Sequence, residues 1–222
     1  MRFPLLVILL SFLFISCEEE DNSPFYVAKN GVTIKARDWV TVGTTAELNG
    51  VTYTAVDLAS LKEWIKEDKD PSKVVTTNVE TPSPATGSPV AALFLSTGKE
   101  IKGIEGWDVS NWTDMEGLFY SSEPVNVDLS GWDVSQVEDM ALMMRLGDVN
   151  ININNWDVSN ASDMSLMFMW FNNPDFNPDY IEGMDLSGWD VSNVTKCSNL
   201  KTFFDGSNWP ESKRPNFLVE CD

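Results

Sequence analysis

Four aspartates at one position of a repeated tetrapeptide are the first candidates for chemistry in this sequence. The tetrapeptide Trp-Asp-Val-Ser occurs four times, and its aspartates are Asp108, Asp133, Asp157 and Asp190. If each Trp and Val points into a core, the aspartates form an outward column of like charges that repel one another. The column predicts either a binding site, for a cation such as calcium or for a basic partner, or a structural role. In the structural role, neighbouring N–H groups and hydroxyls donate to the aspartates and hold successive turns in register.

An aromatic segment interrupts the spacing of the repeat. The tetrapeptides start 25, 24 and 33 residues apart, so the third interval contains an insertion. This insertion supplies the candidate binding residues Trp170, Phe171, Phe176 and Tyr180. Insertions in repeat proteins map to loops on one face, often the binding face, and aromatic side chains are common interface anchors. The alternative is a loop that folds its aromatic side chains back over the core.

The residue types needed for most enzyme mechanisms are missing from the sequence. It contains no histidine, which excludes Ser-His-Asp and Cys-His mechanisms and most zinc sites. It also contains no glycine-rich phosphate loop. We therefore expect a protein that is not an enzyme and that uses no cofactor, calcium aside. The one catalytic alternative is a hydrolase with two carboxylates, because 34 acidic residues must place some carboxylates close together.

The net charge constrains the class of partner. The chain carries 15 basic and 34 acidic residues, a net charge of −19. Such a surface repels nucleic acid, so the expected partner is an extracellular protein or glycan and not DNA or RNA. Solubility alone is the other explanation for the charge.

Apolar spacing within the repeat indicates the elements that position these residues. Tryptophan and valine two residues apart, as in Trp132 and Val134, are typical of a short strand. Farther on, residues spaced i, i+3, i+4, as in Met140, Met143 and Met144, share one face of a helical turn. The expected fold class is therefore α/β, a leucine-rich-repeat-like solenoid in which short parallel strands alternate with short helices. We expect the solenoid to span residues 71–204, with repeats around 73–94, 104–119, 129–144, 153–168 and 186–201.

A unit of another type precedes the repeats, at residues 25–70. A strand is expected at 32–36, and a hairpin at 46–55 that turns at Asn49-Gly50, a favoured type I′ pair. Asp57 is expected to cap a following helix. Because a solenoid needs terminal pieces to cover its open ends, this unit is predicted to be a small β-rich cap with one helix.

The amino terminus is predicted to be a targeting segment. Residues 1–16 carry one charge, Arg2, before an apolar run too short to span a bilayer, as in a signal peptide. The sequence Phe14-Ile-Ser-Cys17 resembles the lipobox of bacterial lipoproteins, which implies that Cys17 is acylated and anchors the protein in a membrane. Residues 17–24 are expected to be an acidic tether. An ordinary signal peptide with a chance cysteine is the alternative.

Two cysteines remain if Cys17 is acylated. In an oxidising compartment Cys197 and Cys221 are expected to form a disulfide, which would tie down a carboxy-terminal cap at residues 205–222. Two buried free thiols are the alternative.

The repeat resembles that of a known family. The runs Asp128-Leu-Ser-Gly-Trp-Asp-Val-Ser-Gln-Val-Glu-Asp-Met140 and Trp189-Asp-Val-Ser-Asn-Val-Thr195 are similar to the repeat of BspA-like surface proteins, which are bacterial lipoproteins and wall proteins with short leucine-rich-type repeats. The resemblance implies a protein of the bacterial cell envelope, facing the exterior, with an adhesive or ligand-holding role and no known reaction. The predicted function is therefore a lipid-anchored binding or adhesion module for proteins or glycans. An accessory subunit of a surface complex is the alternative.

Overall fold

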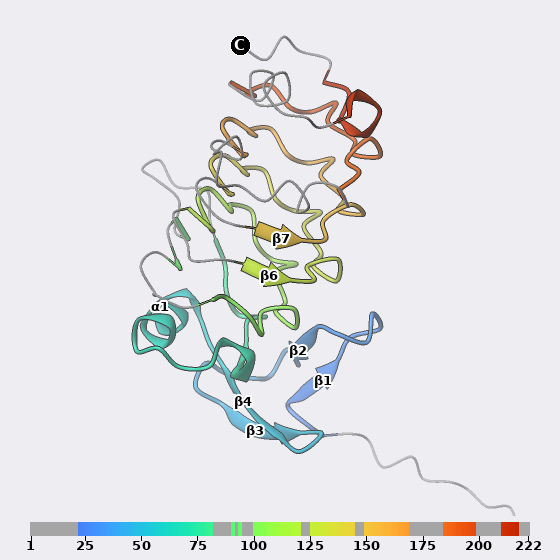
Figure 1. Cartoon of the computed structure of the whole chain (residues 1–222). Helices are drawn as coiled ribbons and strands as arrows, with labels where there is room; N and C mark the ends of the chain where they lie inside the picture. The colour runs from blue at the N-terminus through green and yellow to red at the C-terminus, as the bar shows by residue number, and fades with distance from the viewer. Residues whose placement is uncertain are drawn as a thin grey trace, which may run out of the picture.

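The computed structural model describes residues 22–81, 90–91, 93–94, 100–120, 125–144, 149–168, 184–198 and 210–217. The predicted signal peptide, Cys17, the aromatic insertion and Cys221 lie outside these residues. Figure 1 shows the amino-terminal strands at one end of an elongated molecule, with the repeat copies following one another away from them. None of the described helices is long and apolar enough to cross a membrane.

Two antiparallel pairs and one added strand build the amino-terminal unit. The strands are β1 (Phe25–Val27), β2 (Ile34–Ala36), β3 (Thr45–Leu48), β4 (Val51–Ala55) and β5 (Val74–Val75). β1 pairs with β2 and β3 with β4, while β5 lies parallel to β4 on its other side. Asn49 and Gly50 join β3 to β4 with φ angles of 53° and 79°, as a type I′ turn requires. The predicted hairpin is therefore confirmed.

Helix α1 (Leu58–Lys66) follows β4 and begins after Asp57, as predicted. The Asp57 carboxylate accepts the N–H of Ser60, and the Ser60 hydroxyl accepts the N–H of Asp57, so the two side chains form a capping box. Leu61 and Ile65 are buried in the same hydrophobic cluster as the repeats. The 3-10 helix η1 (Pro71–Lys73) then leads into β5. Helix α1 thus packs the amino-terminal unit directly on the repeats.

The repeat segments predicted to be helical are not helices. In the second copy the N–H groups of Met140, Leu142 and Met144 donate to carbonyls of the next copy, so they are not used for bonds along a helix. Leu142 has a φ of 56°, a left-handed conformation that a right-handed helix does not contain. The spacing still identified core residues correctly, since Met140, Met143 and Met144 are all buried.

The segments predicted to be strands are not strands either. The N–H of Trp132 donates to the carbonyl of Leu129, and that of Val137 donates to Val134, so the tetrapeptide lies between two turns. Strands β6 (Val125–Val127) and β7 (Val149–Ile151) come before the tetrapeptides and pair in parallel. Near the carboxyl end the described residues include a second 3-10 helix, η2 (Glu211–Lys213).

The expected α/β fold, a leucine-rich-repeat-like solenoid of alternating strands and helices, is therefore wrong. The described residues form small sheets of two or three strands, and their one α-helix lies outside the repeats. The physical reason is that the backbone N–H groups of the predicted helical segments find acceptors in the neighbouring copy, which leaves no i→i+4 bonds to build a helix.

A row of indole rings forms the centre of the core. Trp107, Trp132 and Trp156 stack with centroids 6.4 and 6.3 Å apart and interplanar angles of 4°. The Nε1–H groups of Trp132 and Trp156 donate to the carbonyls of Ile104 and Leu129, each three residues before the tryptophan of the preceding copy. Trp107 donates in the same way to the carbonyl of Pro71. Ring stacking and these hydrogen bonds together fix the distance between copies.

Candidate functional site

Three of the four aspartates that follow a tryptophan lie at the surface. Asp133, Asp157 and Asp190 each accept the N–H of the serine two residues later, at 3.0 to 3.2 Å. The hydrogen bonds from Ser159 and Ser192, first of all those of their side chains, lower the pKa of Asp157 and of Asp190. All three carboxylates therefore close their own turns, and the lowered pKa keeps Asp157 and Asp190 negatively charged at neutral pH.

Asparagine side chains make hydrogen bonds between neighbouring turns. The Nδ2 groups of Asn111, Asn160 and Asn193 donate to the carbonyl oxygens of Thr77, Ser135 and Ser159 respectively. The aspartates of the column bond differently: Asp133, Asp157 and Asp190 bond within their own turns, and Asp108 also contacts the amino-terminal unit. In the described part of the chain, no three Asp, Glu, Cys or His side chains lie grouped so that they could hold a metal ion.

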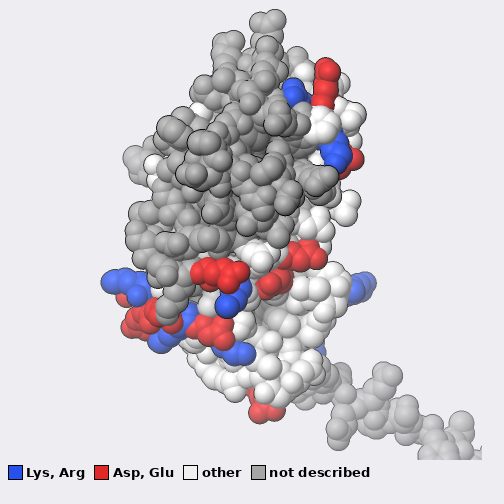
Figure 2. All heavy atoms as spheres, in the orientation of Figure 1, with Lys and Arg blue, Asp and Glu red and all other residues white. Residues whose placement is uncertain are grey.

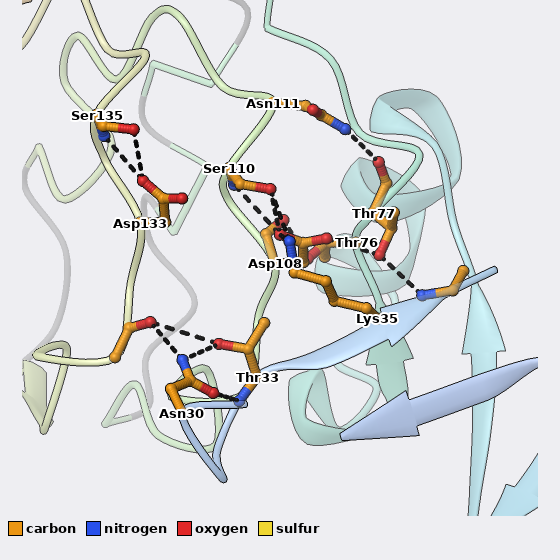
Figure 3. A network of polar contacts seen from close by, with 12 residues as sticks. Asn30, Thr33, Lys35, Thr76, Thr77, Asp108, Ser110, Asn111, Asp133 and Ser135 are labelled. Atoms are coloured by element: carbon orange, nitrogen blue, oxygen red, sulfur yellow. Dashed lines mark hydrogen bonds and ion pairs between the residues drawn. The ribbon is translucent and has the colours of Figure 1, made fainter. Parts of the chain in front are cut away.

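Asp108 differs from the other three aspartates because the amino-terminal unit covers it (Figure 3). The residue is 3% exposed. Lys35 Nζ, from β2, lies 3.1 Å from Oδ1, and the Thr77 hydroxyl donates to Oδ2 at 2.8 Å. The Ser110 hydroxyl donates to Oδ1 at 2.7 Å, the same Asp–Ser contact that Asp133 and Asp157 make. Both carboxylate oxygens thus face donors, which compensates the buried charge.

A cleft of about 220 Å³ opens beside this ion pair. Asn30 Nδ2 donates to the carbonyl of Gly131 at 3.0 Å, and its Oδ1 accepts the N–H of Thr33, so this side chain ties the β1–β2 turn to the second copy (Figure 3). Lys35 is engaged with Asp108 on the same wall. Because these polar groups bind one another, we interpret the cleft as the joint between the two parts of the molecule and not as a ligand site.

A second carboxylate column escaped the sequence analysis. Asp114, Asp139 and Asp163 form successive parallel bridges, and Lys196 takes this position in the last copy. Burial raises the pKa of Asp139 to about 6; the charges of Asp163 and Asp114 add to the rise, and the hydrogen bond from the Ala141 N–H opposes it. A signal for this column was present in the sequence, because each of these aspartates directly precedes a methionine. The methionines are buried, so the aspartates next to them lie close to the core.

Several predicted site residues lie outside the described part of the chain. They are Cys17, Trp170, Phe171, Phe176, Tyr180 and Cys221. Cys197 is described, and it is buried and disulfide-bonded. Its pairing with Cys221 and the binding role of the aromatic insertion stay predictions.

A larger groove, of about 300 Å³, lies where the end of α1 meets the chain before the first copy. Its apolar floor is made by Ile65, Pro71, Phe94 and Ile101. Its charged rim is made by Asp68, Lys69, Asp70, Glu100 and Lys102. Figure 2 shows acidic and basic side chains intermingled around α1, in contrast to the mostly uncharged face of the amino-terminal sheets.

Contacts with α1 hold one side of this rim in place. Lys69 Nζ lies 5.0 Å from the centroid of the Trp64 ring and 2.5 Å from a carboxylate oxygen of Glu67. The Trp64 indole N–H donates to the Asp70 carbonyl at 3.0 Å. An apolar floor inside a rim of both charges suits a partner that offers apolar and charged groups together. The sequence analysis missed this groove because only the fold joins its two segments, which lie about 30 residues apart.

Comparison with known proteins gives one finding about relationship. A family model described as "Mycoplasma protein of unknown function, DUF285" matches residues 90–209, a range that contains all four tetrapeptides. Neither a curated protein nor a solved structure gives a significant match. The family match fits a bacterial surface protein, and it does not extend to BspA-like repeats. Because the model covers more than half of the chain, this protein belongs to the DUF285 family.

Proposed function

We propose that this protein is a lipid-anchored binding or adhesion module of the bacterial cell surface, and that it binds an extracellular protein or glycan in the groove beside α1. The lipid anchor is Cys17, on the basis of its lipobox-like sequence. The resemblance of the repeat to BspA-like surface proteins supports the adhesive role. The single observation that carries the proposal is the groove, with its apolar floor and its rim of both charges.

The chemistry of the groove favours binding over catalysis. Ligand sites are typically concave and mostly apolar, with a few polar groups that orient the ligand. The floor residues Ile65, Phe94 and Ile101 are at most 9% exposed and belong to the hydrophobic core, so the groove lies directly on that core. On the rim, Lys69 and Lys102 pair with Glu67 and Glu100, and all four side chains are exposed. Exposed pairs of this kind are weak, so both ammonium groups can exchange these partners for carboxylates of an acidic glycan or of a protein.

A binding screen with charge-reversal variants tests this proposal. The chain from residue 18 onward, which lacks the acylation site, is screened against glycans, extracellular matrix proteins and extracts of the producing cells. The variant Lys69→Glu/Lys102→Glu should bind the identified ligand about tenfold more weakly, since loss of two charge contacts is worth at least about 1.4 kcal/mol. The matched control Lys62→Glu/Lys66→Glu makes the same charge change on α1 outside the groove and should bind as the unmodified chain does.

Two results would count against the proposal. Equal weakening in both variants would mean that the overall charge matters and the groove does not. Binding only to components of the producing cell would favour an accessory subunit of a surface complex instead.

A further inference from the structure

Among the residues that the structure describes, the exposed large apolar side chains are concentrated near the amino terminus. Among the described residues, the large hydrophobic side chains that remain exposed are Val27, Val32, Trp39 and Val42. Trp39 is the most exposed, at 60%, and Val42 is 44% exposed. The tryptophans of the four tetrapeptides, by contrast, are at most 5% exposed. An exposed tryptophan beside an exposed valine therefore needs an explanation that the core does not supply.

Trp39 and Val42 lie on two turns beside the point where the chain enters the fold. The N–H of Arg37 donates to the carbonyl of Pro24, and its Nε donates to the carbonyl of Ser23, so these turns begin next to the first described residues. Val40, between the two exposed residues, is 4% exposed and belongs to the core of the amino-terminal sheets. This buried anchor holds the turns in place while Trp39 and Val42 face solvent.

The predicted lipid anchor is close to these turns. Four residues separate Cys17 from Asn22 in the sequence, and the five steps between their Cα atoms span at most about 18 Å when fully extended. Figure 1 shows β1 and β3 at the end of the molecule opposite to the last repeat copies. A lipid on Cys17 would therefore hold this end of the fold, and not the repeats, at the membrane surface.

Charge distribution favours the same orientation. Four acidic residues, Glu18 to Asp21, follow the anchor in the tether. Within the part of the chain after the tether, residues 22–56 contain three basic and two acidic side chains, whereas residues 57–222 contain 11 basic and 28 acidic ones. Bacterial bilayers with anionic headgroups repel the acidic part and do not repel the amino-terminal sheets. Arg37, at the start of the exposed turns, donates from Nε to the Ser23 carbonyl and lies 5.4 Å from the centroid of the Tyr26 ring.

From these observations we infer that residues 37–44 form a membrane-contact surface, in which Trp39 and Val42 enter the interface of the same bilayer that holds the Cys17 anchor. Tryptophan is suited to this position because its ring is apolar and its N–H can bind the headgroup region. The contact would fix the tilt of the molecule and keep the groove beside α1 away from the lipid surface. This inference rests on the proposed lipid anchor.

Contact quenching by brominated lipids tests the inference. The full acylated chain is reconstituted into vesicles of phosphatidylethanolamine and phosphatidylglycerol, with and without bromine on the acyl chains near the headgroups. Brominated lipid should quench the long-wavelength tryptophan emission of the unmodified chain, and Trp39→Phe should abolish this quenching. Trp64→Phe removes another partly exposed tryptophan, one beside the groove, and should leave the quenching unchanged. Val42→Asp should weaken it by placing a charge in the contact.

The outcomes separate the inference from the proposed anchor. Equal quenching in the unmodified chain and in Trp39→Phe, or no quenching of an acylated chain, overturns the membrane-contact surface and leaves the anchor standing. Mass spectrometry of the protein from its own cells checks the anchor itself. A chain without an acylated Cys17 overturns the anchor and the inference with it.

Discussion

The first copy of the tetrapeptide and the three later copies have the same sequence and different surroundings. Asp108 is 3% exposed and lies against Lys35 and Thr77, whereas Asp133 and Asp157 are solvent-exposed. The Asp–Ser bond within the turn is common to these copies. The repeat thus determines the turn, and the neighbouring unit decides whether its carboxylate is a surface charge or half of a buried ion pair.

The largest effect should come from removing the carboxylate that the two parts of the molecule share. Asp108→Ala leaves Lys35 and the Thr77 hydroxyl without their acceptor, so the free energy of unfolding should fall by about 3 kcal/mol. Asp157→Ala breaks only the bonds to its own turn and should cost about 1 kcal/mol or less. Urea unfolding of both variants measures the difference. Similar losses would show that the first copy is not special.

Removing the cation of the same pair should have a smaller effect. Lys35→Met leaves the Asp108 carboxylate buried, but Thr77 and Ser110 still donate to it, so we expect a loss of about 2 kcal/mol. Lys29→Met changes an exposed lysine near the same joint and serves as the control. If both lysine variants unfold at the same urea concentration, the ion pair contributes nothing to the joint.

The second carboxylate column predicts a pH dependence with a definite sign. The folded protein raises the pKa of Asp139 from its ordinary value of 3.8 to about 6, so between these values the folded state keeps a proton that the unfolded state has lost. The contribution of Asp139 to the free energy of unfolding is therefore fully present below about pH 4 and is lost as the pH rises through 6.

Asp139→Asn should remove this dependence. We expect it to stabilise the protein by about 1 to 2 kcal/mol at pH 8, after allowance for the partial exposure of the carboxylate, and to have little effect at pH 4. Thermal unfolding across this pH range measures it. Asp157→Asn is the matched control, because the lowered pKa of Asp157 predicts the opposite sign, with stability lost as the pH falls. A pH-independent effect of Asp139→Asn would refute the burial argument.

The smallest effect is expected at a second position that sets the first copy apart. The first copy has Trp112 at the position that Val137 occupies in the second copy. The Nε1–H group of Trp112 is buried and has no hydrogen-bond partner in the described residues. Trp112→Phe should change the free energy of unfolding by less than about 1 kcal/mol, because the lost ring area is offset by removal of the unsatisfied donor. Trp132→Phe loses a real hydrogen bond, to Ile104, and should cost about 1 to 2 kcal/mol. Urea midpoints that place the two variants in the reverse order would contradict this interpretation.

Local signals in the sequence predicted the amino-terminal elements well. Asn49-Gly50 prefers positive φ angles, and Asp57 with Ser60 can satisfy the first helical N–H groups, so a few neighbouring residues decide both structures. The repeats gave weaker local signals. The spacing of Met140, Met143 and Met144 is compatible with a helix and also with a turn that points these side chains inward. It therefore predicted that the three side chains are buried, but it did not determine the backbone conformation.

The sequence by itself determined the period of the repeats, their core residues and the hairpin and helix before them, because these depend on side-chain type and on contacts close along the chain. Only the tertiary structure decided where the backbone N–H groups of the repeats donate, which aspartate is buried, and which residues meet in the groove beside α1. Those outcomes depend on partners from other copies or from the amino-terminal unit, such as Lys35 for Asp108 and Phe94 for Ile65. Contacts between segments far apart along the chain leave no local pattern in the sequence. Here such contacts bury the aspartate of the first tetrapeptide in an ion pair, while the aspartates of the three later, identical tetrapeptides stay exposed.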